Sequence, residues 1–254
     1  MEKVETYRYK LILEYDGSKY HGFQMQNENH LKTIEGQLKK AFKNFTQNDV
    51  KIFASGRTDT GVHAIAQTIH VDLNRKFSNH QIIMGLNYYL KDEEIAILEA
   101  EMVDENFNSR FDAKMRHYRY AILNRKAPAI IDKNRVWHVG GKKLDILAMQ
   151  NASKYLLGKH DFSAFRDAEC QALSPIRTIK NINIFSDDEE KIFVEVSAKS
   201  FLHHMVRNIV GTLVWVGKNK ISVDDVKNIL ESRDRSKSGP NAPSCGLYFL
   251  KTDY

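Results

Sequence analysis

Two hydrophobic periods alternate along the chain. Apolar residues at every second position, as at Tyr9, Leu11 and Leu13, predict β-strands, and apolar residues three or four positions apart predict amphipathic helices. In the first half these patterns predict strands at residues 9–15, 51–55, 68–73 and 95–103 and helices at residues 34–45 and 78–90. Thr33 is the expected N-cap of the first helix. The resulting order, β-α-β-β-α-β, is that of a ferredoxin-like unit.

The second half repeats this order with one additional helix. The patterns predict strands at residues 116–124, 176–185, 192–198 and 246–251, helices at residues 144–157 and 201–216, and a turn at Asp187-Asp188. Ser222 and Asp225 resemble a capping box that opens the additional helix. We therefore predict an α+β fold of two ferredoxin-like, RRM-like β-α-β-β-α-β halves, whose antiparallel sheets pack around a central cleft.

The densest group of polar residues lies between the second and third predicted strands, in the sequence Ser-Gly-Arg-Thr-Asp-Thr-Gly-Val-His-Ala at residues 55–64. Two glycines bracket Arg57 and Asp59, and glycine permits sharp turns and the close approach of a ligand. A loop between two strands has a rigid support, so Asp59 could act as a nucleophile or a base. Residue types alone favour the simpler interpretation, a tight turn in which Asp59 accepts backbone hydrogen bonds.

The segment Gly-Arg-Thr-Asp-Thr-Gly-Val-His-Ala at residues 56–64 resembles the central motif of the tRNA pseudouridine synthase A family. Further segments resemble that family in the same order along the chain. They are residues 13–24, 110–120, 160–166, 175–179, 201–211 and 242–248. The resemblance extends over almost the whole chain and implies an isomerase that converts uridine to pseudouridine in tRNA.

Pseudouridine formation breaks the bond between ribose C1′ and uracil N1, rotates the base and joins C1′ to C5. No atom is gained or lost, and the sequence lacks a Rossmann glycine motif, a Walker A loop and an obvious metal-ligand cluster. We therefore expect no cofactor and no metal. The resemblance implies that Asp59 is the catalytic carboxylate, acting by covalent attack or by removing a proton from C2′. Residues 1–104 would carry this loop, and residues 105–254 would complete the active-site cleft.

The resemblance also implies roles for three residues of the second half. Arg207 is expected to pair with Asp59 and keep it ionised, because burial alone opposes the charge; it could instead be a solvated helix arginine or a phosphate contact. Tyr118 corresponds to the family's active-site tyrosine and would stack on uracil or assist proton transfer at C5, although its spacing also suits a core strand residue. Leu247 is expected to line the uracil pocket, unless it is a plain core leucine.

A uridine in a stacked RNA stem or loop has to be extruded before it reacts. Arg57 is expected to fill the space left behind and to hold a phosphate, unless it is an ordinary surface arginine. Seven other basic residues are candidates for contacts to the RNA backbone, although for any single one of them an ordinary solvated charge is the favoured interpretation. They are Arg110, Arg116, Arg119, Lys199, Arg233, Arg235 and Lys237. His203 and His204 suggest a metal, but neighbours on a helix point in different directions, so no metal site is expected there.

Composition and charge agree with an RNA partner. The chain has 254 residues, of which 42% are hydrophobic and 28% charged, as in globular proteins. With 38 Lys and Arg against 32 Asp and Glu, the formal net charge is +6, which favours a polyanionic partner. Cys170 and Cys245 form no CxxC pair, the first ten residues hold no apolar signal core, and no apolar stretch reaches the ~20 residues that cross a bilayer. We expect a cytoplasmic protein with no membrane segment.

The family acts on uridines 38, 39 and 40 in the anticodon arm of tRNA and is typically homodimeric, so the resemblance implies both properties for this chain. A non-catalytic RNA-binding protein of two RRM-like sheets would share the element order, but the RNP1 signature is absent. A nucleoside or glycoside hydrolase usually needs two cooperating carboxylates, whereas the motif centres on Asp59.

Overall fold

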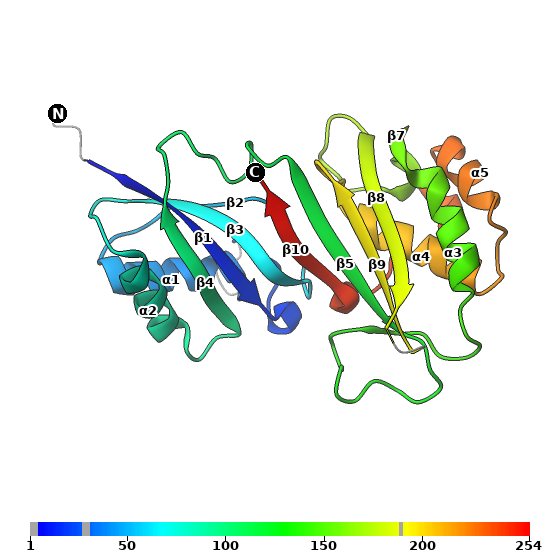
Figure 1. The fold of residues 1–254 in the computed structure, drawn as a ribbon, viewed down its shortest axis with the longest axis horizontal. Coiled ribbons are helices and arrows are strands. Elements are labelled where there is room, and N and C mark those ends of the chain that lie inside the picture. Colours follow the sequence, from blue (N-terminus) through cyan, green and yellow to red (C-terminus); the bar gives the residue numbers. More distant parts are fainter. Residues whose placement is uncertain (1–4, 27–30, 188–189) are drawn as a thin grey trace. The chain divides into compact units, whose positions relative to one another are not determined.

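The computed structural model describes residues 5–26, 31–187 and 190–254. The chain forms two compact units, which are described separately. The first unit contains Met1–Lys114 and Phe249–Tyr254, and the second contains Met115–Tyr248 (Figure 1). The last strand, β10 (Leu247–Asp253), begins in the second unit and ends in the first. The assignment of residues 1–104 and 105–254 to separate functional halves stays a prediction.

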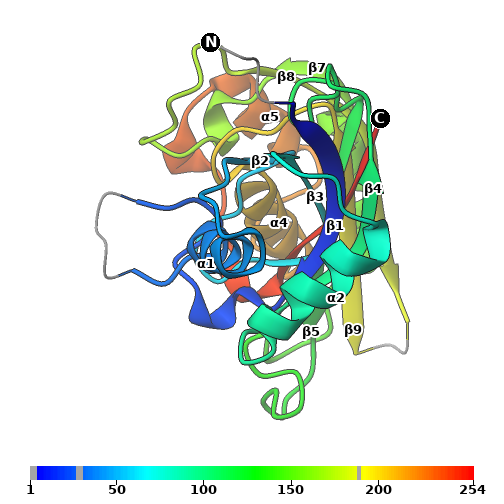
Figure 2. The ribbon, with the colours of Figure 1, turned by 90° about the vertical axis from the view of Figure 1, so that its left-hand side faces the viewer.

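In its described residues, the first unit has two α-helices and an antiparallel group of strands. Its elements are β1 (Tyr7–Tyr15), α1 (Ile34–Thr46), β2 (Ile52–Ala54), β3 (His63–Leu73), α2 (Asn79–Leu90) and β4 (Ile95–Met102). β1 lies between β3 and β4 and is antiparallel to both, and β2 pairs with β3. Figure 2 shows α1 and α2 beside these strands, and Leu38 of α1, Leu86 of α2 and Leu11 of β1 are completely buried. The alternation read from residues 9–15 therefore marks the core face of β1.

Short-range signals set where these helices begin. The side chain of Thr33 accepts a hydrogen bond from the Gly36 N–H at 3.2 Å, so Thr33 is the N-cap of α1 as predicted. Ser78 and Gln81 form a reciprocal capping box at the start of α2. Both caps satisfy backbone N–H groups that a helix leaves unpaired in its first turn.

The described part of the second unit has three α-helices and a second antiparallel group of strands. Its elements are β5 (Met115–Leu123), β6 (Trp137–His138), α3 (Ile146–Ser153), β7 (Gly158–Asp161), β8 (Ile176–Ser186), β9 (Lys191–Ala198), α4 (Met205–Gly217) and α5 (Asp225–Ser232). The strands pair in the order β5-β9-β8-β7, and the short β6 is parallel to β5. The predicted capping bonds between Ser222 and Asp225 are present before α5.

Two predicted helix boundaries in this unit differ from the structure by four residues. The helix expected from residue 201 begins only at Met205, because His204 adopts a left-handed conformation (φ +60°) that ends any helical path before it. The helix expected to residue 157 ends at Ser153, and Gly158 (φ +94°) then opens β7, a strand that was not predicted. The predicted turn at Asp187-Asp188 lies partly outside the described residues.

The protein is thus a mixed α/β fold with mostly antiparallel strands, and the described residues contain five α-helices. Within that part of the chain, none of the helices combines the length and the apolar character that crossing a membrane requires.

Candidate functional site

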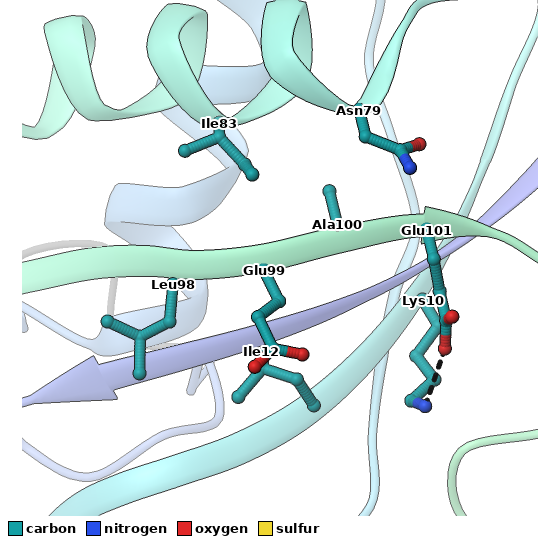
Figure 3. Close-up of a pocket in the computed structure, with 8 residues that line it drawn as sticks. All are labelled: Lys10, Ile12, Asn79, Ile83, Leu98, Glu99, Ala100 and Glu101. Atoms are coloured by element: carbon teal, nitrogen blue, oxygen red, sulfur yellow. Dashed lines mark hydrogen bonds and ion pairs between the residues drawn. The ribbon is translucent and has the colours of Figure 1, made fainter.

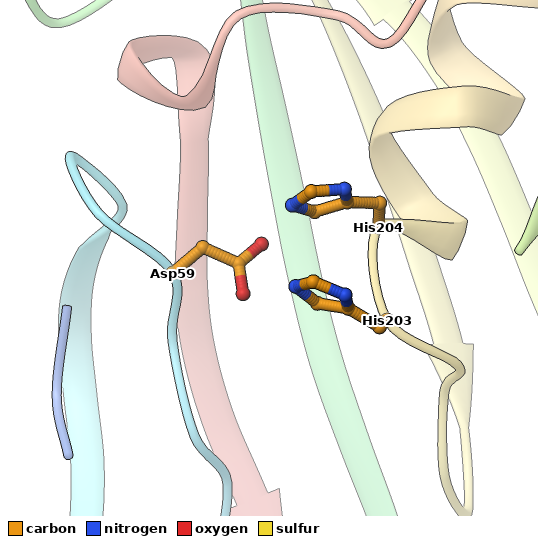
Figure 4. A group of neighbouring side chains, drawn as sticks. All are labelled: Asp59, His203 and His204. Atoms are coloured by element: carbon orange, nitrogen blue, oxygen red, sulfur yellow. The ribbon is translucent and has the colours of Figure 1, made fainter. Parts of the chain in front are cut away.

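The polar loop predicted from the sequence joins β2 to β3 in the first unit. Thr58 is buried, Asp59 is half-buried and Arg57 is exposed. Figure 4 shows the Asp59 carboxylate projecting from this segment. The loop therefore presents one acidic and one basic side chain, while the residue between them points into the unit.

Hydrogen bonds hold the backbone on both sides of Asp59. The Phe23 N–H donates to the Thr58 carbonyl at 2.9 Å, and the Val62 N–H donates to the Asp59 carbonyl at 3.1 Å. The hydroxyl groups of Tyr15 and Thr58 form a buried hydrogen bond of 2.8 Å. Hydrogen bonds within the unit therefore fix the backbone that carries the Asp59 carboxylate.

The base of the loop is held through a buried amide. The Ser55 hydroxyl donates to Gln67 Oε1 at 2.8 Å, and Gln67 Nε2 donates to the Gly56 carbonyl at 2.6 Å. Ser55 and Gln67 are almost completely buried. Because a buried amide without partners would be costly, this pairing sets the position where the loop leaves β2.

Residues 17–22 form a backing for the loop that the sequence pattern did not predict. Gly22 has φ +83°, and a Cβ added to it would lie 2.8 Å from the Thr58 carbonyl oxygen. A Cβ on Gly17 would lie 2.0 Å from the carbonyl oxygen of Val62. The Gly17 N–H also donates to Nδ1 of His63 at 3.1 Å. The signals in the sequence were the two glycines after the first strand and the resemblance of residues 13–24 to the family.

The second unit contains Tyr118, Arg207 and Leu247. Tyr118 lies on β5, is 9% exposed and meets the Phe201 ring edge-on, with 5.1 Å between the ring centroids. Arg207 lies in the first turn of α4, where its Nε donates to the Ala242 carbonyl at 2.7 Å. Leu247 is buried at the start of β10.

The segment before Leu247 packs on a buried tyrosine. The Tyr120 hydroxyl donates to the Pro243 carbonyl at 2.6 Å, and a Cβ on Gly246 would lie 2.7 Å from the Tyr120 ring. Burial raises the pKa of Tyr120 far above its ordinary value, with the neighbouring Cys245 adding to the shift and Arg207 opposing it. Tyr120 therefore stays protonated and acts as a hydrogen-bond donor.

His203 and His204 lie before α4 and not on a helix, so the geometric reason given for excluding a metal there was wrong. Their rings are stacked, with centroids 3.8 Å apart and planes 29° apart (Figure 4). Nδ1 of His204 lies 2.7 Å from Oδ2 of Asp167. A backbone hydrogen bond from Glu169, followed by the contact with His204, lowers the pKa of Asp167. Both imidazoles are chemically suited to offer nitrogen ligands.

Several of the basic candidates for RNA contact have partners within their own unit. Arg119 binds Glu195 through Nε and Nη2, Arg116 donates to the Lys199 carbonyl, and Arg233 lies 3.3 Å from Asp161. Arg235 reaches Asn208 of α4 through Nη2 at 2.9 Å. These four side chains therefore have partners within their own unit before any RNA is present.

A pocket of about 340 Å³ lies elsewhere in the first unit, between α2 and the strands β1 and β4 (Figure 3). Lys10 and Glu101 form an ion pair of 2.6 Å at one end of it. Its lining contains none of the predicted site residues. It consists of Lys10, Ile12, Asn79, Ile83, Leu98, Glu99, Ala100 and Glu101.

Comparison of the sequence with known protein sequences gives one consistent result. The sequence matches a family model described as tRNA pseudouridine synthase over residues 11–112 and 152–254. It is 45% identical over 247 residues to a tRNA pseudouridine synthase A of Xanthobacter autotrophicus, which covers 97% of this chain and 99% of that protein. A tRNA pseudouridine synthase A of Caulobacter vibrioides is 46% identical over 247 residues. That alignment covers 97% of this chain and 98% of that protein. Among solved structures, a Cbf5-Nop10-Gar1 complex gives a TM-score of 0.35 at 9% identity over 96% of this chain and 57% of that chain.

Proposed function

Because the chain belongs to the tRNA pseudouridine synthase family, it is an isomerase that converts uridine to pseudouridine in tRNA, and we propose that Asp59 carries the reaction. The C1′–N1 bond breaks, the freed uracil rotates, and C1′ joins C5. The proton at C5 leaves to water and N1 takes up a proton from water, so the product is an isomer of uridine. A carboxylate beside the ribose can attack C1′ or remove the proton at C2′. Either route needs an ionised side chain held at a constant position.

One observation carries the assignment of Asp59. The carbonyls of Thr58 and Asp59 both accept backbone hydrogen bonds, from Phe23 and Val62, while the Asp59 side chain stays only half-buried. A rigid backbone with an accessible carboxylate suits a group that has to meet a substrate atom in one geometry.

The other residues predicted from the sequence are proposed in supporting roles. Arg207 supplies the positive charge that keeps Asp59 ionised, and Tyr118 stacks on the extruded uracil or assists proton transfer at C5. Leu247 forms an apolar wall of the uracil pocket. Arg57, which is exposed, fills the space that the extruded nucleotide leaves and contacts a phosphate.

The substrate positions, the assembly and the cellular location also belong to the proposal. We propose that uridines 38, 39 and 40 of the anticodon stem-loop are modified, in the cytoplasm and by a homodimer. The net charge of +6 favours a polyanionic substrate. The order β1-α1-β2-β3-α2-β4 in the first unit supports a ferredoxin-like half. The central cleft expected between two such halves stays a prediction.

Tritium release tests the proposed reaction. The protein is incubated with tRNA that carries tritium at uracil C5, and the label released to water is counted. We expect release by the unmodified protein and none by Asp59→Asn, which keeps the shape of the side chain and removes its charge. Binding of tRNA should persist in that variant. Asp49→Asn is the matched control, because the Asp49 side chain is 86% exposed in another loop.

The same assay separates the alternatives. A hydrolase would free uracil that can be detected by chromatography, and a non-catalytic RNA-binding protein would release neither uracil nor tritium. Full activity of Asp59→Asn would exclude Asp59 as the catalytic group, while the family assignment would stand.

A further inference from the structure

A short segment of the second unit, residues 238–242, crosses α4 in direct backbone contact; we call it the strap. A Cβ on Gly211 of α4 would lie 1.7 Å from the Pro240 carbonyl oxygen. A Cβ on Gly239 of the strap would lie 2.5 Å from the Thr212 nitrogen. No side chain fits at either position without movement of the backbone, so the two glycines permit the crossing.

A buried hydroxyl joins the strap to the helix. The Gly239 N–H donates to Thr212 Oγ1 at 2.8 Å, and that hydroxyl donates to the Asn208 carbonyl at 2.9 Å. Thr212 and Asn208 are almost completely buried. The hydroxyl therefore accepts from the strap and donates to the helix, and its loss would leave a buried N–H without a partner.

Arg235 ties the same two elements together through its planar side chain. Nη1 donates to Ser238 Oγ at 2.8 Å and to the Gly239 carbonyl at 3.0 Å, and Nη2 donates to Asn208 Oδ1 at 2.9 Å. Asn208 in turn donates through Nδ2 to the Phe165 carbonyl at 2.9 Å. A guanidinium can make these diverging bonds at once because its donors have a fixed geometry, which an ammonium group lacks.

The strap ends at Ala242, which binds Arg207 twice. The Ala242 carbonyl accepts from Arg207 Nε at 2.7 Å, and the Ala242 N–H donates to the Arg207 carbonyl at 3.3 Å. The first bond restricts the plane of the Arg207 guanidinium. The orientation of that side chain therefore depends on where the strap lies on α4.

We infer that Arg235 is a positioning residue for pseudouridine formation: it holds the strap on α4 so that Ala242 orients Arg207. This inference rests on the role proposed for Arg207. It replaces the earlier expectation that Arg235 contacts the RNA backbone. A residue of this kind should affect the rate of the bound complex more than the affinity for tRNA.

Arg235→Lys tests the inference, because lysine keeps the positive charge but lacks the planar guanidinium with its diverging N–H donors. Single-turnover tritium release at saturating protein should slow by about tenfold or more, while Kd for tRNA stays within about twofold. Arg75→Lys, at an exposed arginine of the first unit, is the matched control and should change neither quantity. A weakened Kd with an unchanged rate would identify Arg235 as an RNA contact and overturn the inference.

Thr212→Val and Thr212→Ser form a second test that does not change Arg235. Valine has nearly the shape of threonine but cannot accept from Gly239, whereas serine keeps the hydroxyl. Rates are compared below the melting temperature of each variant. We expect slow tritium release by the valine variant and near-normal release by the serine variant. Equal rates for the two variants would contradict a strap that positions Arg207.

A double-mutant cycle with Arg207→Lys separates this inference from the proposed function. If Arg235 acts through Arg207, adding Arg235→Lys to Arg207→Lys should cause little further loss, because the effects are not additive. A normal rate for Arg207→Lys alone would reject the proposed role of Arg207. Slow tritium release by Arg207→Lys together with a normal rate for Arg235→Lys would reject only the positioning role of Arg235. Fully additive losses of rate in the double variant would reject the same role.

Discussion

The hydroxyl groups of Tyr15 and Thr58 lie 2.8 Å apart in a buried hydrogen bond between β1 and the loop that carries Asp59. The two residues are 43 positions apart in the chain. Tyr15 is 4% exposed and Thr58 is 7% exposed, so water cannot readily replace either partner. The position of the carboxylate thus depends on a core residue of the preceding strand.

Tyr15→Phe should weaken both stability and catalysis. The change leaves the Thr58 hydroxyl buried without this partner, at an expected cost of about 1–3 kcal/mol in the free energy of unfolding. Urea denaturation measures that cost, and single-turnover tritium release measures the rate. Tyr88→Phe is the control, because the Tyr88 side chain is 65% exposed on α2. Unchanged stability of Tyr15→Phe would show that the hydroxyl pair does not hold the loop.

Gly22→Ala should distort the backing of the same loop. Gly22 combines φ +83° with a Cβ position only 2.8 Å from the Thr58 carbonyl oxygen. Gly141 has φ +99° and nothing within 4 Å of its Cβ position, so Gly141→Ala isolates the backbone strain from the clash. Both variants should lose about 1–3 kcal/mol of stability to the strained backbone, and only Gly22→Ala should also slow tritium release. Equal rates for the two alanine variants would argue against the backing role.

Protonation of His70 should destabilise the first unit at mildly acidic pH. Burial lowers the pKa of His70 below its ordinary value of 6.5, and the nearby Arg8 charge lowers it further. His70 Nδ1 lies 2.8 Å from Ser109 Oγ and 3.1 Å from the Ser109 N–H. An unprotonated Nδ1 accepts the bond from that N–H, and protonation of Nδ1 would break it. Below pH 6.5 the unfolded chain binds the proton first, so this contribution to stability is complete above that pH and declines as the pH falls toward the folded pKa.

The effect is measured by comparing the unfolding of His70→Asn with that of the unmodified protein between pH 5 and 8. Asparagine does not titrate in this range, and its amide oxygen can still accept a hydrogen bond from Ser109. The variant should show a flatter dependence of stability on pH. His80→Asn, at an exposed histidine of α2, should keep the original slope. Parallel curves for the unmodified protein and His70→Asn would contradict the prediction.

Asp72→Asn should slightly lower the free energy of unfolding at neutral pH, and this loss should disappear in strong acid. Arg8 binds both carboxylate oxygens of Asp72 at 2.7 Å and lowers the pKa of that carboxyl. The folded pKa lies below the unfolded one, so the contribution is present above the ordinary Asp pKa and is lost as the pH falls through the folded value. With the Asp72 side chain 36% exposed, solvent screening limits the effect to about 1 kcal/mol at neutral pH. Denaturation should show the difference at pH 7, and a series at decreasing pH should show it shrink as the pH falls below the ordinary Asp pKa.

Local sequence determined most of the element order and the loop that carries Asp59. The alternation in β1, the stripe of α1 and the N-caps Thr33 and Ser78 act over a few residues, and the structure contains each of them. Residues 56–64 resemble a family motif, and this resemblance indicated the reaction. A contiguous motif can be recognised without knowledge of the fold.

Only the tertiary structure decided which distant residues support these local features. Residue type made Arg235 a candidate for RNA contact, and the fold instead placed its guanidinium on Asn208, 27 residues away in the chain. The left-handed His204 shortened a helix whose apolar stripe began earlier, and Gly22 met the Thr58 carbonyl across a turn. Such contacts depend on how separate elements pack, and neither residue type nor periodicity records the distance between two elements in space.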